Sequence, residues 1–397
     1  MRFLFYSHDA VGLGHMRRNL ALAARLADTA PDASVLLAVG TDEVNRVGVP
    51  PHVEVIKLPG LRKVANECYG SRHLSIPGQD MLALRAAVLE ALVHSYRPDV
   101  MVVDKHPLGA SGELVPALDT IRELGCRAVL GVRDILDDRE TVRREWTPAV
   151  HAGIARHYHR VFVYGQRRVF DPVREYDWPS VVADRVRFCG YVVSRFDSQD
   201  WREEPPPVFL TRRRTRPLVL ATAGSGEDGF ALLRGFIEAA AGAPWDAVAV
   251  TGPMAARDDH EALRRTAVEA GIACYTSLPG LGRWFGAVDA LVSMCGYNTI
   301  AEAVSTGLPT VCVPRTVPRL EQLIRARAFE RLGLLRVVEP QRLTPELLRR
   351  EIAGALASPR RALLARGREV LDFDGASRVA EHLLDLAAAP AGAGVQE

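Results

Sequence analysis

Short apolar segments alternate along the first half of the chain with longer stretches in which apolar residues recur every three or four positions. The short segments predict β-strands at 2–7, 34–39, 53–58, 98–103, 127–132 and 160–164. The longer stretches predict helices at 15–29, 79–97, 112–124 and 136–158. Strands that alternate with helices are typical of a doubly wound, Rossmann-like α/β domain, which we place at residues 1–195. Within it, residues 59–78 form a long loop without a recognisable signature.

The alternation stops near residue 196 and restarts near residue 217. Residues 196–216 contain three consecutive prolines and a run of arginines without periodicity, which predicts an inter-domain linker. Strands are then predicted at 217–222, 246–251, 272–275, 289–293, 309–313 and 335–338. Helices are predicted at 229–242, 258–270, 297–306, 318–332, 344–356, 359–371 and 374–388.

The second half therefore predicts another Rossmann-like domain at 217–372. The chain is predicted to end with a C-terminal helix at 373–389 and a flexible tail at 390–397. The helix could pack on either domain, including the first. Two doubly wound domains in tandem predict a cleft between facing domains, and such clefts are common ligand sites.

The composition narrows the range of functions. Hydrophobic residues make up 48% and charged residues 25% of the 397 residues, as in an ordinary globular protein. The 50 basic and 48 acidic side chains leave a net charge of +2, too small to indicate nucleic acid as a partner. The six cysteines lack metal-ligand spacing, and no apolar run suits a signal peptide or a membrane span. We expect a cytoplasmic protein without an integral membrane segment; the sequence does not indicate its oligomeric state.

Candidate chemistry in the first half follows strands 1 and 4, because a sheet ordered 3-2-1-4-5 brings their carboxyl ends to one crevice. After strand 1, the sequence GLGHMRR places Gly14 and His15 at a helix start, where the helix dipole favours a neutral imidazole base. Asp104 follows strand 4 and would orient this ring. A phosphate contact or a capping role at the helix terminus is the alternative for His15. Other polar residues that follow strands are candidate acceptor ligands, with surface or capping roles as the alternative: His8, Asp9, His106 and Asp134.

Two glycine-containing turns open helices after strands 1 and 4 of the second half. The first contains Gly224, Ser225 and Gly226, and the second contains Gly296, Asn298 and Thr299. Unpaired N–H groups at two helix N-termini predict a diphosphate site that needs no metal. Glu302 lies one turn further, where a carboxylate can accept the hydroxyls of a ribose. Alternatively, Asn298 and Thr299 cap the helix, with Thr299 and Glu302 as a capping box.

The segment CGYNTIAEAVSTGLPTVCVPR, followed by EQLIRA, resembles the donor-binding region of nucleotide-sugar glycosyltransferases with the GT-B fold. It is especially similar to the CGWNS pattern of the UDP-sugar transferases, and GLGH is similar to the GGxGGH turn of the peptidoglycan GlcNAc transferases. The resemblance implies that Asn298 and Thr299 meet the phosphates and Glu302 the ribose. It further implies that Glu321 with Gln322 meets the sugar hydroxyls, and that the uracil lies near Leu278 and Leu281. Met294 stands where many relatives carry a phosphate-binding histidine.

The activity implied by this resemblance is that of a metal-independent, inverting glycosyltransferase. It would move a sugar such as GlcNAc or glucose from a UDP-sugar to a small-molecule acceptor, without a cofactor. The UDP-sugar hydrolase of the pseudaminic acid pathway has a similar GxGHxxR helix, and sugar-nucleotide 2-epimerases share the architecture. Hydrolysis, epimerisation and non-catalytic nucleotide-sugar binding therefore remain alternatives, and the sequence does not distinguish UDP from dTDP.

One short sequence matches a known metal-binding motif. Asp372, Phe373 and Asp374 spell DxD, the metal-binding motif of the other glycosyltransferase fold. They fall between two predicted helices rather than after a strand of the cleft, which indicates a turn.

Overall fold

A computed structural model of the chain describes residues 1–8, 13–41, 49–65, 68–194, 207–211, 213–278 and 280–389. The chain forms two compact units. The first joins residues 1–192 to the C-terminal chain from Asp374 onward, and the second runs from Val193 to Phe373. The predicted tail 390–397 and most of the predicted linker 196–216 lie outside the described residues.

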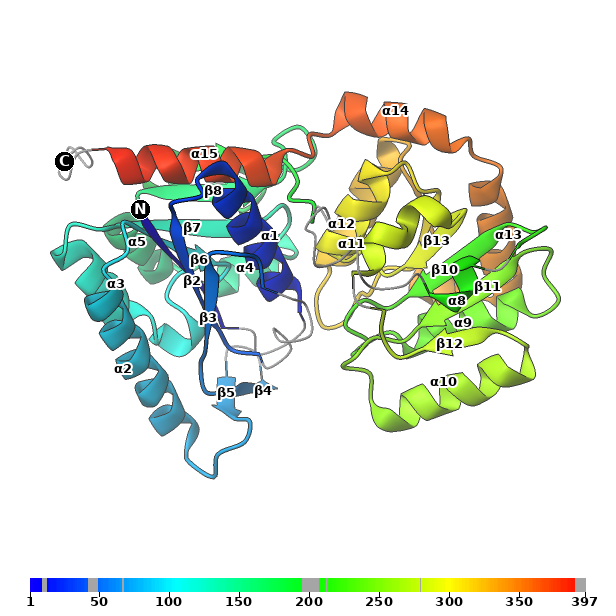
Figure 1. Cartoon of the computed structure of the whole chain (residues 1–397), viewed down its shortest axis with the longest axis horizontal. Helices are drawn as coiled ribbons and strands as arrows, with labels where there is room; N and C mark the ends of the chain where they lie inside the picture. The colour runs from blue at the N-terminus through cyan, green and yellow to red at the C-terminus, as the bar shows by residue number, and fades with distance from the viewer. Residues whose placement is uncertain are drawn as a thin grey trace. The chain divides into compact units, whose positions relative to one another are not determined.

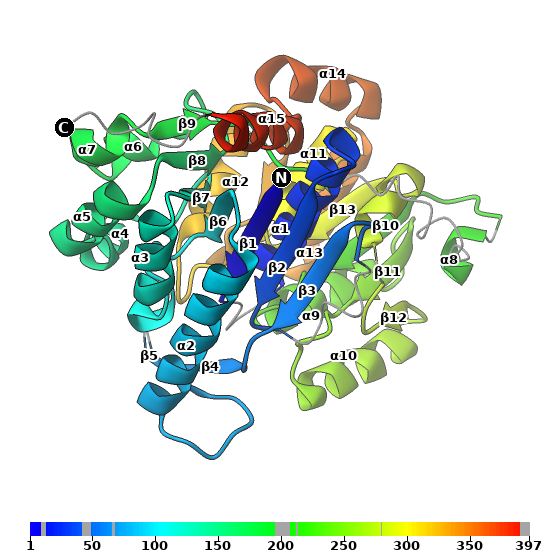
Figure 2. The same ribbon diagram turned by 60° about the vertical axis from the view of Figure 1, so that its left-hand side comes forward.

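The first unit is built on a parallel sheet with the strand order β3-β2-β1-β6-β7-β8-β9, and Figure 2 shows β3, β2 and β1 side by side. This confirms the predicted 3-2-1-4-5 order. The strands of this unit are β1 (Arg2–Ser7), β2 (Ser34–Val39), β3 (Val53–Lys57), β4 (Leu61–Ala65), β5 (Cys68–Ser71), β6 (Val100–Asp104), β7 (Arg127–Arg133), β8 (Arg160–Tyr164) and β9 (Val186–Phe188). Its helices are α1 (Gly14–Thr29), α2 (Gly78–Tyr96), η2 (Ala110–Gly112), α3 (Val115–Glu123), α4 (Arg139–Glu145), α5 (Pro148–His157), α6 (Pro172–Glu175), α7 (Ser180–Ala183) and α15 (Gly375–Ala388).

The central strands of this sheet are covered on both faces, as in other doubly wound folds. Every residue of β6 is buried, and in β1 only Arg2 is exposed. Such strands become near-continuous apolar runs, which is why they were readable from sequence. The C-terminal helix α15 packs against α1 (Figure 1). Its first residue must be glycine, because a Cβ on Gly375 would lie 2.7 Å from main-chain atoms of Gly190 and Tyr191.

The second unit has a parallel sheet with the order β12-β11-β10-β13-β14-β15. Its strands are β10 (Leu218–Thr222), β11 (Asp246–Val250), β12 (Ala273–Tyr275), β13 (Ala290–Ser293), β14 (Thr310–Cys312) and β15 (Arg336–Val337). Its helices are α8 (Val208–Thr211), α9 (Phe230–Ala240), α10 (Arg257–Glu269), η4 (Leu281–Ala287), α11 (Tyr297–Ser305), α12 (Glu321–Arg331), η5 (Pro340–Arg342), α13 (Pro345–Leu356) and α14 (Arg360–Val370). Two adjacent, parallel pairings place β10 between β11 and β13, with Thr222 opposite both Val250 and Ser293.

The single helix predicted at 136–158 is wrong, because the structure has two helices there. Helix α4 ends at Glu145, and α5 begins at Pro148. Thr147 is extended, and its hydroxyl accepts a hydrogen bond from the main-chain N–H of Val150, so it caps the second helix. Proline at the first helical position disfavours the helical conformation in the residue before it, which separates the two elements.

Two further segments differ from the prediction. The long loop predicted at 59–78 contains an antiparallel hairpin of β4 and β5. Within the predicted linker, α8 buries Phe209 against the core of the second unit, where its ring lies 5.6 Å from that of Tyr275. Both are short elements held by tertiary contacts, and a four- or five-residue segment carries too few positions to show a periodicity.

Candidate functional site

The carboxyl edge of the first sheet, between β1 and β6, gathers the residues that the strand order was expected to bring together. Asp104 is the last residue of β6, and His15 is the second residue of α1. His15 Nδ1 lies 3.4 Å from Asp104 Oδ2, although 88 positions separate the two residues in the chain. Asp104 is fully buried, and the His15 side chain is 13% exposed. Gly14 opens α1 and is exposed.

Arg18 is a third member of this group that the sequence analysis missed. Its Nη2 lies 2.7 Å from both carboxylate oxygens of Asp104 and 3.2 Å from His15 Nδ1. The guanidinium also lies over the ring of Tyr164 from β8, 5.3 Å from the ring centre. The signal was present in the sequence, because residues three apart on a helix share a face and Arg18 follows His15 at that spacing. Asp104 is thus shared between a histidine and an arginine rather than paired with His15 alone.

The pKa values of both titratable partners are lowered, but for different reasons. For His15, burial disfavours the imidazolium and lowers the pKa from 6.5 to about 4, against the opposing attraction of Asp104. For Asp104, burial alone would raise the pKa, but the positive charges of Arg18 and His15 outweigh it and lower the pKa to about 2. Near neutral pH the site therefore holds an ion pair of Arg18 with Asp104 and a neutral imidazole beside it.

Two more of the predicted residues join the same edge. The ring of His8, which follows β1, lies 4.3 Å from that of His106 and 5.7 Å from that of His15, measured between ring centres. The ring centre of Tyr69, from β5, lies 5.9 Å from that of His8. Burial also lowers the pKa of His8 well below 6.5, and its Nδ1 is buried without a hydrogen-bond partner. Two neutral rings, His8 and His15, with His106 beside them, therefore border the carboxyl ends of β1 and β6.

The two remaining residues predicted to meet an acceptor are Asp134 and Asp9. Asp134 follows β7, and its carboxylate accepts a hydrogen bond from the main-chain N–H of the next residue, Ile135. A Cβ at Gly165, after β8, would lie 2.7 Å from the Cβ of Asp134, so Asp134 lies against the end of the next strand. Asp9 lies outside the described residues. The hydrogen bond with Ile135 is compatible with the capping alternative for Asp134 and does not test a contact with an acceptor.

The carboxyl edge of the second sheet is formed mainly by main chain. The turn after β10 contains Gly224 and Gly226, which have positive φ angles of 68° and 104°. A Cβ on Gly226 would lie 2.5 Å from the carbonyl oxygen of Thr251, so only glycine fits there. The carbonyl of Ser225 accepts a hydrogen bond from the N–H of Met254 at 2.8 Å. The turn is thus held in place by the loop after β11.

Helix α11, which follows β13, begins without a side-chain cap. Gly296 is its N-cap residue, and it has no side chain that could accept a hydrogen bond from the first turn. Asn298 and Thr299 lie inside the first turn and are half-buried. The predicted alternative of a capping box is wrong, because its threonine would have to precede the first helical residue, whereas Thr299 is the third residue of the helix. The first main-chain N–H groups of a helix have no acceptor within the helix, and Glu302 lies buried on the next turn.

Arg325 of α12 contacts the residues at the start of this helix. Its Nη1 donates a hydrogen bond to the carbonyl of Cys295 at 3.1 Å, and its guanidinium lies 5.7 Å from the ring centre of Tyr297. Cys295 is a non-glycine residue with a φ of 68°. The left-handed conformation turns the chain from β13 into α11, and the hydrogen bond from Arg325 holds its carbonyl in that position.

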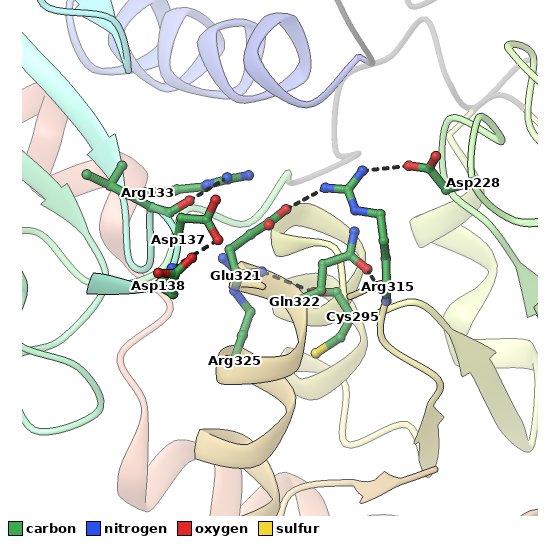
Figure 3. Close-up of polar contacts among 10 residues, drawn as sticks. Arg133, Asp137, Asp138, Asp228, Cys295, Arg315, Glu321, Gln322 and Arg325 are labelled. Carbon is green, nitrogen blue, oxygen red and sulfur yellow. Dashed lines mark hydrogen bonds and ion pairs between the residues drawn. The ribbon is translucent and has the colours of Figure 1, made fainter. Parts of the chain in front are cut away.

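The two residues expected to meet the donor sugar open helix α12, and both are buried. Figure 3 shows how Arg315, from the loop after β14, engages them. Its Nη2 lies 2.7 Å from Glu321 Oε1, and its main-chain N–H donates to Gln322 Oε1 at 3.0 Å. Its Nη1 lies 2.6 Å from Oδ2 of Asp228, in the turn after β10. The sequence analysis singled out neither Arg315 nor Asp228, which are 87 residues apart.

Leu278 and Leu281, the expected neighbours of the nucleobase, flank the start of η4. Both are half-buried and pack on an apolar cluster that includes Leu220 and Phe285. The DxD sequence at Asp372 and Asp374 lies in the connection between α14 and α15, as predicted. Within the described residues, no three histidine, cysteine, aspartate or glutamate side chains come close enough to hold a metal ion. In the same part of the chain, no helix is long and apolar enough to cross a membrane.

Comparison with known proteins gives a family match for one part of the chain. Residues 273–381 match the model of the glycosyltransferase family 28 C-terminal domain. The chain is 35% identical over 118 residues to the UDP-N-acetylglucosamine–N-acetylmuramyl-(pentapeptide) pyrophosphoryl-undecaprenol N-acetylglucosamine transferase of Mycobacterium ulcerans. The corresponding protein of Mycobacterium tuberculosis also matches with 35% identity over 118 residues. The matched part is 28% of this chain and 30% and 29% of the two relatives, so the chain spans less than a third of their length.

Solved structures match over nearly the whole chain. The spinosyn forosaminyltransferase SpnP has a TM-score of 0.66 at 17% identity, and the alignment covers 98% of this chain and 100% of that one. A UDP-glucosyltransferase from Polygonum tinctorium has a TM-score of 0.65 at 14% identity, with coverage of 98% and 99%. MurG of Acinetobacter baumannii has a TM-score of 0.57 at 14% identity, with coverage of 97% and 99%. At these identities the likeness establishes the fold, which is GT-B.

Proposed function

We propose that the chain is a glycosyltransferase that uses a nucleotide-sugar donor, because it has the GT-B fold and residues 273–381 match the glycosyltransferase family 28 C-terminal domain. The observation that carries the proposal is the uncapped N-terminus of α11 beside buried Glu302, within the family match. Main-chain N–H groups suit a diphosphate, and a carboxylate suits the hydroxyls of a ribose. We take UDP as the nucleotide, with UDP-GlcNAc and UDP-glucose as the first donors to test.

In this proposal the first unit supplies the base for the transfer. His15 is neutral at physiological pH, so its ring can accept the proton of an acceptor hydroxyl that attacks the anomeric carbon with inversion. The imidazolium that forms would be stabilised by the negative charge of Asp104, 3.4 Å away. His8 and His106 border the same edge and are the residues that we assign to the acceptor, a small hydroxylated molecule.

The donor residues are assigned to the second unit. The turn with Gly224, Ser225 and Gly226, together with the first turn of α11, would stabilise the charge that develops on the departing diphosphate. Glu321 and Gln322 would read the sugar hydroxyls, and Leu278 with Leu281 would border the uracil. Since this stabilisation needs no metal, we expect EDTA to leave the initial rate unchanged, while added Mg²⁺ changes it less than twofold. Loss of activity in EDTA that Mg²⁺ restores would contradict the metal independence.

The decisive experiment is a thermal-shift screen of the full chain with UDP, dTDP and a panel of their sugars, followed by mass spectrometry of the products. A transferase releases UDP at a substantial rate only when an acceptor is present. Rapid release of UDP and free sugar without an acceptor, at about 1 per second or faster, would identify a hydrolase instead. Conversion of the donor to an epimer would identify a sugar-nucleotide 2-epimerase, and binding without turnover would leave a nucleotide-sugar-binding protein.

A further inference from the structure

Arg315 joins two loops at the carboxyl edge of the second sheet. It belongs to the loop after β14, while its partner Asp228 belongs to the turn after β10. In the strand order, β13 lies between these two strands. The ion pair of Arg315 with Asp228, drawn in Figure 3, therefore links the loops that follow the two neighbours of β13, the strand that leads into α11.

The hydrogen bonding of this guanidinium is incomplete. Nη1 and Nη2 each hold a carboxylate, whereas the Nε–H is buried and has no hydrogen-bond partner in the structure. A buried donor without an acceptor costs free energy, and such groups are uncommon in folded proteins. The guanidinium thus has one more N–H that can donate to an anionic oxygen.

The two carboxylates that hold Arg315 differ in their access to water. The side chain of Glu321 is 2% exposed, and that of Asp228 is 38% exposed. Breaking the contact with Glu321 would cost an ion pair of a buried carboxylate, whereas Asp228 is partly exposed and can be released into solvent at little cost. An incoming anion would therefore replace Asp228 and leave the contact with Glu321 in place.

We propose that Arg315 is a cation that binds the diphosphate of the donor, and that Asp228 holds this side chain until the diphosphate displaces it. This inference rests on the proposed function, which supplies the diphosphate. A guanidinium with free N–H groups binds phosphate oxygens in a planar, two-pronged geometry. It adds a full positive charge to the partial charge of the helix N-terminus, and so supplies without a metal part of the charge that a departing diphosphate needs.

The competing explanation is that Arg315 is a permanent clamp that only orients Glu321 and Gln322. The two explanations predict opposite effects for Asp228→Asn. If Asp228 competes with the diphosphate, its neutralisation frees Arg315 and tightens UDP binding. If Asp228 is part of a clamp, its neutralisation loosens the site and weakens UDP binding.

The test measures the affinity of the full chain for UDP, uridine and inorganic pyrophosphate by calorimetric titration. We expect Arg315→Met to weaken UDP and pyrophosphate about 10-fold or more, and to change uridine less than twofold. We expect Asp228→Asn to tighten UDP roughly 2- to 5-fold, the range for a partly exposed ion pair. Arg234→Met is the matched control, because it removes an exposed arginine that pairs with Glu238 along α9, and it should change none of the affinities.

Equal weakening of UDP and uridine in Arg315→Met, or weaker UDP binding in Asp228→Asn, overturns the proposal in favour of the clamp. Should Arg315→Met fail to fold, Arg315→Lys and Asp228→Asn give the decision, because both keep a polar side chain at the altered position. Arg315-dependent binding of pyrophosphate without binding of UDP or dTDP would support the anion site and contradict the proposed function. UDP binding that is unchanged in Arg315→Met contradicts only the role of Arg315, and a wild type that binds none of these ligands contradicts both.

Discussion

At the carboxyl edge of the first sheet, the polar groups are side chains: the imidazoles of His8, His15 and His106, and the carboxylate of Asp104 with Arg18 against it. At the corresponding edge of the second sheet, they are main-chain N–H groups of two glycine turns, bordered by the bridge of Arg315 to Asp228 and Glu321. Both edges occupy the same topological position, next to the first strand of their sheet. One fold thus carries two kinds of chemistry in equivalent places.

The difference follows from what each type of group can do. A buried imidazole changes charge within the range of ordinary pH, so it suits the transfer of a proton. Main-chain N–H groups do not titrate, and an arginine stays positively charged at any ordinary pH. Both therefore suit an anion that must be held throughout a reaction. Changes at the first edge should therefore affect turnover and pH dependence, and changes at the second edge should affect nucleotide affinity.

The largest expected effect is at His15. Removing a general base typically costs 10²–10⁴-fold in rate, so His15→Ala should lose turnover by about that factor. Its affinity for UDP should stay within twofold of wild type, because we assign the donor to the second unit. Steady-state kinetics and calorimetry on the same preparation check both statements. Near-normal turnover would move the base to another residue, with Asp134 and Asp9 as the next candidates.

Arg18 tests whether the first edge depends on its ion pair. In Arg18→Met, Asp104 would be buried without its main partner, which typically costs about 3–5 kcal/mol of stability. The loss of the positive charge should also raise the pKa of His15. The attraction of Asp104 for the imidazolium would remain, while the repulsion from Arg18 would be gone. Urea denaturation measures the first effect. For the second, the acid limb of the kcat/KM profile should move to higher pH, which a purely structural role would not produce.

Asp104→Asn combined with Arg18→Met is the control for this prediction. The double variant removes both charges, so it should recover much of the stability lost in Arg18→Met. A double variant as unstable as the single one would show that Arg18 matters through packing on Tyr164 rather than through charge.

The stability of the folded chain should depend on pH through His15. Its pKa is about 4 in the folded state and near 6.5 when unfolded, so the unfolded chain binds more protons between these values. Stability is therefore complete above pH 6.5 and falls as the pH drops toward 4, by about 2 kcal/mol between pH 7.5 and pH 5 for this group. Urea denaturation at the two pH values measures the loss. It should be smaller by that amount in His15→Gln, and an unchanged loss would refute the pKa shift.

Glu302 tests the second edge, where a smaller effect is expected. If its carboxylate accepts ribose hydroxyls, Glu302→Ala should weaken UDP by about 1–3 kcal/mol, with little change in the pH dependence of turnover. The comparison of UDP with 2′,3′-dideoxy-UDP separates this contact from general disruption. Wild type should bind UDP more tightly than the dideoxy nucleotide, whereas Glu302→Ala should bind the two with equal affinity. Equal affinities of wild type and Glu302→Ala for UDP would remove this residue from the site.

Much of the fold was readable from the sequence because the central strands are buried on both faces. β1, β2, β6, β7, β10 and β13 appear as apolar runs close to their observed bounds, and the strand order followed from general rules of α/β topology. That order was enough to expect His15 beside Asp104. Hydrophobic periodicity is a local property, so it determines elements and the ends of strands without knowledge of distant neighbours.

Tertiary structure alone decided which side chains complete each group. Arg18 could be placed on the His15 face of α1, but its pairing with Asp104 depends on how that helix lies on the sheet. Arg315 and Asp228 come from loops two strands apart, and the β4–β5 hairpin brings Tyr69 against His8. The break between α4 and α5 and the lack of a cap on α11 were equally unreadable. These features depend on the distance between charged or polar atoms that are far apart in sequence, which becomes defined only when the packed elements fix their positions.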